Sequence, residues 1–270
     1  MDVPIFTIWL TKNNWDAMPY IYELFIASWH IFNPNRDVII YTNNELHLSF
    51  LDRHITKIRK LDEFFPGLYE QAKNITDNIQ HQSDFIRYYI LSKTNGIYLD
   101  TDVLLYNSID EILYKIQENN KYVMFSKEDE NMLCNAFIIK LNKKVNSIFE
   151  DIVDNYKNNY IIHSYLFNSQ KYLWLIWRRY NKDIILLDDT IFKPGFMDTE
   201  DKFELIKNNI HTYKGIGFHL TSTNNNYKIL KQYLDINCYN KTPQNEIQQL
   251  MTVIINGYIN LMKEEQYEDS

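Results

Sequence analysis

The chain has 270 residues and a formal net charge of -7, from 28 lysines and arginines against 35 aspartates and glutamates. Such an acidic chain lacks the basic surface that neutralises phosphates, so we expect no nucleic-acid partner. Its length is sufficient for one sizeable core, and a composition of 45% hydrophobic and 23% charged residues excludes an intrinsically disordered chain. We therefore predict a single folded domain over residues 1–270.

The number of cysteines and the hydropathy of the chain indicate in which cellular compartment we expect the protein. Cys134 and Cys238 are too few and too isolated for a disulfide framework or a zinc site, which favours a reducing environment. Residues 1–4 show no basic-then-apolar leader, and no apolar run reaches the length of a membrane span. We expect a cytoplasmic protein without a transmembrane segment.

The first part of the chain alternates strand and helix patterns. The apolar run at 5–10 predicts a buried strand that ends in a polar loop. Apolar residues recur at helical spacing from residue 20 until Asn33-Pro34 interrupts them, and residues 38–41 predict a second strand. Strand, helix and strand in this order predict a parallel α/β unit.

The same alternation continues along the chain. A helix is predicted at 78–94, ended by Asn95-Gly96 in the left-handed conformation that terminates helices, and a strand follows at 97–100. Further helices are expected at 109–116, 145–156 and 172–180, and further strands at 121–126, 132–140, 184–187 and 215–220. The pattern predicts an α/β fold with a mixed, mostly parallel sheet flanked by helices.

A helical extension is predicted at the C-terminus, within a tail of residues 243–270. Residues 245–263 are amphipathic, and the apolar side consists of Ile247, Leu250, Met251, Ile254 and Tyr258. This side can cover the sheet or pair with a second copy of the chain, so a homo-oligomer is one of two alternatives.

The helix predicted at 78–94 carries a polar stripe beside its apolar face. The stripe consists of Gln80, Ser83, Asp84 and Arg87. From Asp84 to the end of this helix the chain advances about 15 Å, and from Gly96 to Asp100 the strand returns about 13 Å. If the turn folds the strand back along the helix, Asp84 and Arg87 lie level with Asp100 and Asp102.

Asp100 and Asp102 close the strand predicted at 97–100, at the edge where open α/β sheets bind ligands. Side chains two residues apart on a strand leave the same face about 6.6 Å apart, so both carboxylates can converge on one divalent ion that keeps open positions for phosphates. Arg87 can pair with a carboxylate or bind a sugar hydroxyl or phosphate oxygen. The alternatives are solvated turn aspartates, a surface ion pair of Asp84 with Arg87, and a helix cap at Ser83.

Two blocks, residues 83–88 (SDFIRY) and 96–102 (GIYLDTD), resemble the DXD-containing sugar transferases of the glycosyltransferase family 32 type. That family includes fungal initiating α-mannosyltransferases, capsular sugar transferases and, more distantly, the catalytic domain of large clostridial glucosylating toxins. The resemblance extends best over residues 4–140. It implies the GT-A fold, a nucleotide-binding α/β sandwich, and transfer of a hexose or N-acetylhexosamine from a nucleotide sugar, with UDP-sugar as the expected donor and retention at the anomeric carbon.

The resemblance also implies roles for the charged residues of both blocks. In similar enzymes the positions matching Asp84 and Arg87 hold the donor sugar. Asp100 would meet the ribose and the metal, and Asp102 would bind Mn²⁺ or Mg²⁺.

Further donor contacts follow from the same resemblance. Ser83 and Tyr98 match positions that touch the nucleoside or the sugar, and Trp9 matches an apolar position beside the uracil. Asn135 matches an Asn-Ala pair that approaches the donor. A core tryptophan and a buried structural asparagine are the alternatives for Trp9 and Asn135.

The chain departs from the family pattern near its C-terminus. Similar enzymes carry a histidine or acidic metal ligand followed by a Ser-Trp pair that contacts the leaving phosphate. Residues 217–222 read GFHLTS, with no tryptophan after them. His219 is the candidate third metal ligand, with a structural histidine as the alternative, and Ser222 or Lys228 would have to replace the indole contact.

Three functions are compatible with these residues. The first is an active retaining transferase in which the acceptor attacks from the front face, because neither Asp188 nor Asp189 is well placed as a covalent nucleophile. The second is a weak or inactive transferase-like module that binds sugar nucleotide or glycan. The third, a metal phosphohydrolase, lacks the additional ligands of a two-metal centre. The aromatic and basic helix at 172–180 can line an acceptor groove, pack a dimer, touch a membrane surface or join the core.

Overall fold

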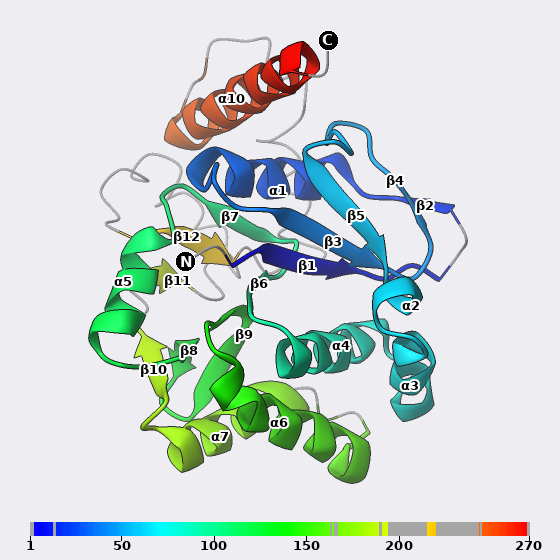
Figure 1. Ribbon diagram of the computed structural model, residues 1–270, viewed down its shortest axis with the longest axis vertical. Coiled ribbons are helices and arrows are strands. Elements are labelled where there is room, and N and C mark those ends of the chain that lie inside the picture. Colours follow the sequence, from blue (N-terminus) through cyan, green and yellow to red (C-terminus); the bar gives the residue numbers. More distant parts are fainter. Residues whose placement is uncertain are drawn as a thin grey trace.

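The computed structural model describes residues 3–12, 15–162, 164, 167–188, 191–193, 215–219, 243 and 245–268. Its centre is a seven-stranded sheet in the order β10-β8-β9-β6-β1-β3-β5 (Figure 1). The strands are β1 (Ile5–Trp9), β3 (Val38–Thr42), β5 (Thr56–Lys60), β6 (Gly96–Leu99), β8 (Val123–Asp129), β9 (Met132–Lys140) and β10 (Ile184–Leu187). Within this sheet β9 runs antiparallel to its neighbours and the other strands are mutually parallel.

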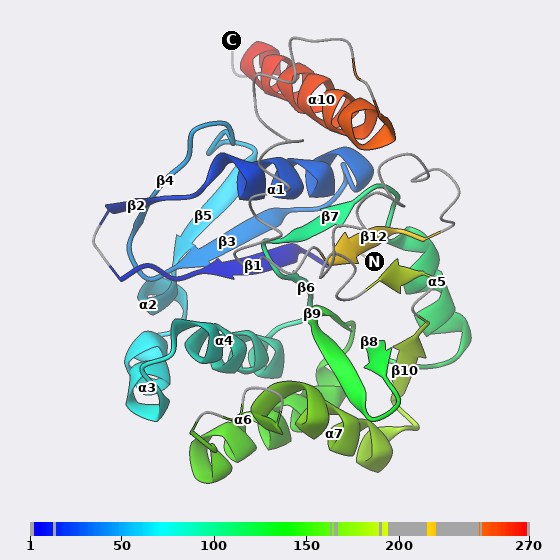
Figure 2. The ribbon, with the colours of Figure 1, turned by 180° about the vertical axis from the view of Figure 1, so that it is seen from behind.

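Two smaller sheets flank the large one. Strands β7 (Val103–Leu105), β12 (Gly217–His219) and β11 (Phe192–Lys193) form a three-stranded sheet, and β2 (Trp15–Ala17) pairs with β4 (Glu45–His47). The three-stranded sheet lies on the same side of the large sheet as α1 (Tyr20–Phe32), as both ribbon views show (Figure 2).

Helices cover the large sheet on both faces (Figures 1 and 2). On the face opposite α1 lie α2 (Leu61–Phe64), α3 (Leu68–Ile75), α4 (Ile79–Lys93), α6 (Asn146–Asn159), the π-helical turn Phe167–Lys171 and α7 (Tyr172–Tyr180). Side chains alternate between two apolar clusters along each central strand: Ile5 and Ile40 join the cluster under α1, whereas Phe6 and Ile39 join the cluster under α4. The predicted α/β fold with a mixed, mostly parallel sheet is therefore confirmed.

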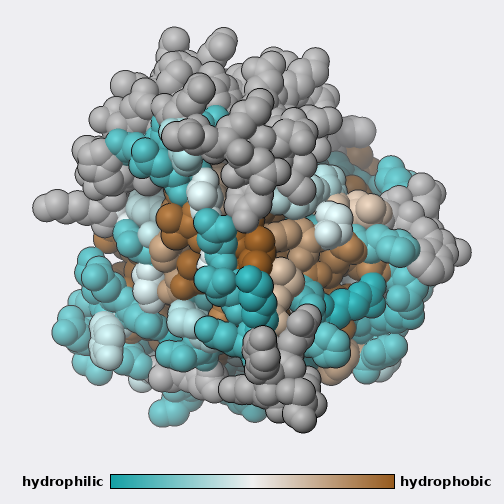
Figure 3. Space-filling view, turned by 90° about the horizontal axis from the view of Figure 1, so that it is seen from above, coloured by the Kyte–Doolittle hydropathy of each residue, from teal (hydrophilic) through white to brown (hydrophobic). Residues whose placement is uncertain are grey.

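The remaining helices complete the α1 side. Helix α5 (Asp110–Glu118) follows β7, and α10 (Glu246–Glu268) packs on α1. Seen from above, polar side chains border a central group of apolar ones (Figure 3). Among the described residues, none of the helices combines the length and apolarity needed to cross a lipid bilayer.

The predicted terminal helix is present as α10, and its apolar side packs on α1 of the same chain. Met251 and Ile254 are buried in the cluster under α1, and a Cβ atom on Gly257 would lie 2.8 Å from Cδ1 of Ile31. The helix therefore covers α1 and not the sheet directly. Its apolar side is therefore largely occupied within the same chain.

Sequence patterns missed the short elements, and β5 shows why. The strand reads TKIRK, with three charged residues in five. Its position at the edge of the large sheet explains the charges, because lysine and arginine protect a free strand edge from pairing with other chains. Hydrophobic alternation does not identify a strand of this kind.

The prediction of a left-handed turn at Asn95-Gly96 is wrong. Helix α4 ends at Lys93, Thr94 is extended, and the described residues with positive φ are Gly67 and Asn120. The glycine has a packing role instead: a Cβ atom at Gly96 would lie 3.1 Å from the ring of Phe6.

The strand geometry predicted for Asp100 and Asp102 is also wrong. Strand β6 ends at Leu99, and β7 begins at Val103. The intervening residues form a turn, closed by the Val103 N–H, which donates to the carbonyl oxygen of Asp100 at 3.0 Å. At this turn the chain leaves the large sheet and enters the three-stranded one.

His30 joins α1 to its neighbours at a buried position. Its side chain is 5% exposed, its Nε2 lies 2.9 Å from Oγ1 of Thr56, and its ring lies 5.5 Å from that of Tyr258 in α10. Burial lowers the pKa of His30 to about 4, and the negative charge of Asp37 opposes this shift.

This lowered pKa predicts a loss of stability in mild acid. Between pH 6.5 and 4 the unfolded chain binds a proton at His30 that the folded chain excludes, so stability falls as the pH falls. Urea unfolding at pH 7 and pH 5 should show that wild type loses about 2 kcal/mol more than His30→Gln does. Equal losses in the two proteins would show that His30 is not the group responsible.

Candidate functional site

A cavity of about 380 Å³ opens at the carboxyl ends of β1 and β6. It is lined by Ile8, Trp9, Leu10, Ile79, Gln80, Ser83, Asp84, Arg87, Tyr98, Asp100, Thr101, Asp102 and His219. This position agrees with the general rule that open α/β sheets bind ligands beyond the carboxyl ends of their strands. Of the nine predicted site residues that the structure describes, eight line the cavity, and Asn135 contacts two of them from behind. Ser222 and Lys228 lie outside the described residues.

Helix α4 delivers two charged side chains to the cavity. Asn78 caps the helix by accepting the Gln80 N–H at 2.9 Å, so the alternative of a cap at Ser83 is wrong. Asp84 is 1% exposed and Arg87 is 4% exposed. They therefore do not form the surface pair that their spacing also allowed.

The Arg87 guanidinium connects three segments of the chain. Its Nη2 lies 2.7 Å from Oδ1 of Asp84 and 3.1 Å from Oδ1 of Asp100, and its Nη1 donates to the carbonyl oxygen of Asn135 at 2.6 Å. Burial lowers the pKa of Arg87, but Asp100 and Asp84 outweigh it and hold that pKa well above its usual range. The guanidinium is thus a fixed positive charge at the back of the cavity.

Asn135 reaches this network because β9 is irregular beside β8. Phe125 pairs with Ile138, yet the next residue, Ser126, pairs with Cys134. The three residues of β9 between those pairs are left out of the ladder with β8. The carbonyl oxygen of Asn135 accepts from Arg87, and its side-chain Nδ2 donates to Asp84 at 3.0 Å.

Asp84 is a buried carboxylate with several partners. Besides Arg87 and Asn135, the hydroxyl of Tyr156 in α6 donates to its Oδ2 at 3.3 Å. Burial raises the pKa of Asp84 to about 6, against the opposing effect of Arg87. Tyr156 belongs to a helix pattern with no distinguishing polar motif, so the sequence contains no signal for this contact.

Tyr98 links the network to the turn. Its hydroxyl donates to Oδ1 of Asp100, and its ring lies under the guanidinium of Arg87, 4.3 Å from ring centroid to Cζ. Burial raises the pKa of Tyr98 well above its usual range, so the phenol remains protonated and keeps Asp100 as an acceptor. Oδ1 of Asp100 is therefore occupied, and Oδ2 lies on the side of His219.

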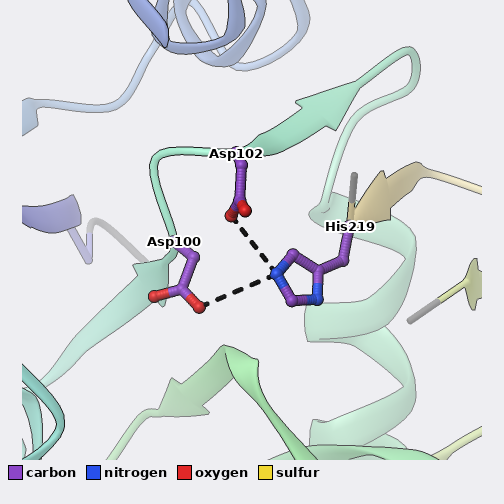
Figure 4. A group of neighbouring side chains, drawn as sticks. All are labelled: Asp100, Asp102 and His219. Carbon is purple, nitrogen blue, oxygen red and sulfur yellow. Dashed lines mark ion pairs between the residues drawn. The ribbon is translucent and has the colours of Figure 1, made fainter. Parts of the chain in front are cut away.

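The second carboxylate oxygen of Asp100 lies in a cluster with Asp102 and His219. Nε2 of His219 lies 3.2 Å from Oδ1 of Asp102 and 3.9 Å from Oδ2 of Asp100 (Figure 4). The register of β12 on β7 places His219 beside Val103, directly after the turn, and this pairing brings the imidazole to the two carboxylates. Asp102 and His219 are more than 100 residues apart in the sequence, so residue spacing alone could not have predicted this contact.

These three side chains fit a divalent cation. One ligand atom from each lies within 4.8 Å of the others, and two carboxylate oxygens with one imidazole nitrogen suit Mn²⁺ or Mg²⁺. Burial lowers the pKa of His219, but Asp102 outweighs it and raises that pKa well above its usual range. Because metal ligands must be deprotonated, binding of a cation here would compete with a proton on His219.

Trp9 ends β1 at the opposite side of the cavity. Its ring packs against Tyr22 at 5.5 Å between centroids, while its edge lines the cavity. Its indole N–H is buried, and no residue in the described part of the chain accepts from it. The indole of Trp9 suits a flat ring stacked against this wall of the cavity.

Known proteins resemble the chain in sequence and in fold. Residues 22–117, about a third of the chain, match the family described as glycosyltransferase sugar-binding region containing DXD motif, which confirms the resemblance inferred from the two blocks. Comparison with curated proteins gives no match.

Solved structures of glycosyltransferases resemble the chain at low sequence identity. The galactosyltransferase LgtC, in complex with donor and acceptor sugar analogs, superposes with a TM-score of 0.51 at 11% identity over 95% of both chains. Mouse xyloside xylosyltransferase 1 gives a TM-score of 0.48 at 8% identity over 82% of this chain and 98% of that one. The glycosyltransferase GlyE of Streptococcus pneumoniae gives 0.49 at 12% identity over 97% of this chain and 64% of that one. The likeness to LgtC confirms the GT-A fold.

The buried ion network predicts that loss of Arg87 alone destabilises the fold more than loss of the charges of Arg87 and Asp84 together. Arg87→Met leaves Asp84 buried without its counter-charge, so we expect a loss of about 3–5 kcal/mol in the free energy of unfolding, measured with urea at pH 8. The double variant Asp84→Asn/Arg87→Met should lose less than Arg87→Met alone, because no charge remains unpaired at position 84.

Arg179→Met is the matched control. Arg179 pairs with Asp151 at 2.8 Å on the surface, where its side chain is 64% exposed, and the expected cost is below about 1 kcal/mol. Similar costs at positions 87 and 179 would contradict the importance of the buried network.

Proposed function

We propose that this chain, which has the GT-A fold and matches the DXD-containing sugar-binding region over residues 22–117, is a metal-dependent retaining glycosyltransferase. It would move a hexose or N-acetylhexosamine from a UDP-sugar to an acceptor, within one catalytic domain of residues 1–270 whose tail comprises residues 243–270. One observation carries the proposal. A single cavity joins a buried guanidinium–carboxylate network to a cluster of two aspartates and a histidine.

Asp100, Asp102 and His219 would hold Mn²⁺ or Mg²⁺. When bound, such an ion supplies Lewis-acid stabilisation of the charge that develops on the departing diphosphate. Tyr98 keeps one oxygen of Asp100 occupied, so the other oxygen remains directed toward Asp102 and His219. We place Ser222, or alternatively Lys228, at the leaving phosphate in the role that an indole has in similar enzymes.

The donor would lie across the cavity. Trp9 supports the recognition of uracil, because it lines the cavity at the end of β1 and its indole offers a flat ring against which a base can stack. Ser83 and Tyr98 would touch the nucleoside or sugar. Asp84 and Arg87 would fix the sugar ring, with Asn135 holding both in place.

We propose front-face attack by the acceptor hydroxyl. The bond from the anomeric carbon to the phosphate oxygen breaks as the acceptor oxygen forms its bond on the same face, and the proton of the acceptor passes to the departing phosphate. Asp84 stabilises the positive charge that develops on the sugar. Asp188 follows β10 on the outer edge of the sheet and is exposed, whereas Asp189 lies outside the described residues. The position of Asp188 offers no support for a covalent glycosyl intermediate.

The first test is removal of the acidic ligand that faces His219. Asp102→Asn should abolish Mn²⁺-dependent release of UDP from UDP-sugars, a reduction of at least about 100-fold, because the carboxylate charge at the cation site is lost. Asp129→Asn, the same change at an exposed position of the β8–β9 hairpin, should leave the rate unchanged. The rates are measured with a panel of UDP- and GDP-sugars, each with and without Mn²⁺.

The same panel of sugar nucleotides distinguishes a transferase from the second candidate function, a module that binds without turnover. A transferase-like module that only binds sugar nucleotide releases no UDP from any donor, and the missing Ser-Trp pair is the feature that favours this second function. Equal rates for Asp102→Asn and wild type would contradict the assignment of the metal site.

The second test concerns the base. Trp9→Ala should weaken UDP binding by about 1–3 kcal/mol, which calorimetry measures directly, because the contact between indole and base is lost. Phe64→Ala removes an aromatic side chain that is 47% exposed and does not line the cavity, so it should bind UDP as wild type does. A Trp9→Ala protein with unchanged UDP affinity would limit Trp9 to a packing role.

A further inference from the structure

Helix α7 and the turn that precedes it hold large apolar side chains in solvent. Four of the seven exposed large hydrophobic residues in the described part of the chain are found here, and they are Ile161, Ile162, Phe167 and Leu175. Single exposed apolar residues are ordinary on a protein surface, but several within one short segment indicate an interaction site.

The exposed turn has a defined shape. Asn168 is buried; its Oδ1 accepts from the Ile161 N–H at 2.9 Å, and its Nδ2 donates to the carbonyl oxygen of Ile161 at 2.7 Å. The Ser164 N–H donates to the same carbonyl oxygen at 3.2 Å. Because both backbone groups of Ile161 are bound, the fold presents Ile161 and Ile162 outward in one conformation.

Basic side chains accompany these apolar ones. Residues 155–182 contain five lysines and arginines and no aspartate or glutamate, in a chain with a formal net charge of -7. Lys171, Leu175 and Arg178 are exposed and spaced four and three residues apart, so they share one stripe along the helix. Arg179 pairs with Asp151 of α6, whereas Lys171 and Arg178 form no ion pair with any described residue. Their charges are therefore available to an anionic partner.

The composition of this surface favours lipid over protein. Leu173 and Ile176 face the core, and Trp174 and Trp177 are half-buried at the border, with ring centroids 4.6 Å apart. Tryptophan is enriched where a membrane meets water, and lysine and arginine attract anionic headgroups. Lysine is depleted from interfaces between proteins, so the pairing of Leu175 with its basic neighbours suits a headgroup layer better.

The turn lies beside the cavity. The hydroxyl of Tyr160, the residue before the turn, contacts Nδ1 of His81 and donates to Oγ1 of Thr76 at 3.0 Å. His81 belongs to the first turn of α4, where Ile79 and Gln80 line the cavity. Helices α6 and α7 lie at the end of the molecule opposite α10 in both ribbon views (Figures 1 and 2).

We propose that this surface docks on an anionic lipid bilayer, and that its contacts are Ile161, Ile162, Phe167, Lys171, Leu175 and Arg178. The apolar side chains enter the headgroup layer, and the two cations bind lipid phosphates, as in proteins that lie in the membrane interface. The inference goes beyond the proposed function and does not depend on it, because lipid binding requires neither a metal ion nor a sugar nucleotide.

The test is sedimentation of the full chain with vesicles of phosphatidylcholine alone and of phosphatidylcholine mixed equally with phosphatidylglycerol. Wild type should bind the mixed vesicles, less tightly as NaCl is raised. Lys171→Gln/Arg178→Gln should weaken this binding about thirtyfold. Lys115→Gln/Lys263→Gln removes the same charge at exposed positions of α5 and α10, so it should stay within about twofold of wild type.

A second pair of variants tests the apolar contacts. Ile162→Ser should weaken binding to the mixed vesicles about tenfold, because a side chain that is 70% exposed no longer enters the headgroup layer. Val253→Ser changes a side chain that is 57% exposed on α10 and should bind as wild type does. Urea unfolding should give all of these variants the stability of wild type within about 0.5 kcal/mol, because each substituted side chain is exposed.

Three results would overturn the inference. The first is absence of binding to both kinds of vesicle, and the second is equal binding to both, which would exclude recognition of anionic lipid. The third is a wild-type dimer in analytical ultracentrifugation that Ile162→Ser dissociates, because the surface would then join two copies of the chain. Release of UDP, measured without vesicles, tests the proposed function separately.

Discussion

The site depends on one buried guanidinium. Arg87 is 4% exposed and contacts carboxylates from a helix and from a turn, together with a carbonyl oxygen from a third segment. A buried charge is tolerated only when its partners are in place, so the three segments must meet in one arrangement. Helix α4, the Asp100 turn and the irregular part of β9 are positioned relative to one another by this requirement.

The same network separates the roles of the two motif aspartates. Asp100 has one oxygen with Arg87 and Tyr98 and the other toward His219, so it connects the buried network to the cluster that it forms with Asp102 and His219. Asp102 has no ion pair with Arg87 among the described residues and faces His219. The network therefore fixes Asp100, whereas Asp102 contributes its charge on the side of His219.

Two interruptions of regular sheet structure supply polar groups to the site. At residues 100–102 the chain turns out of the large sheet into the three-stranded one, and between Phe125 and Ser126 the pairing of β8 with β9 shifts. Regular strands would direct alternate side chains into the two apolar clusters. Each interruption instead releases polar groups, which are the turn carboxylates in one case and the carbonyl and amide of Asn135 in the other.

The sequence by itself determined the α/β class and most long elements, because helical and strand periodicities are local properties. It also determined that Asp84 and Arg87 lie level with Asp100 and Asp102, because the helix from Asp84 to its end and the strand from Gly96 to Asp100 have nearly equal lengths. It did not determine the turn geometry of the motif, the packing reason for Gly96, the charged edge strand β5, or the contacts of Asn135 and Tyr156. Tertiary structure decided these, because each depends on pairing between segments distant along the chain or on a shift in strand register that composition does not encode. His219 belongs to both categories: the family resemblance suggested it as a ligand, but the register of β12 on β7 placed its imidazole at the carboxylates.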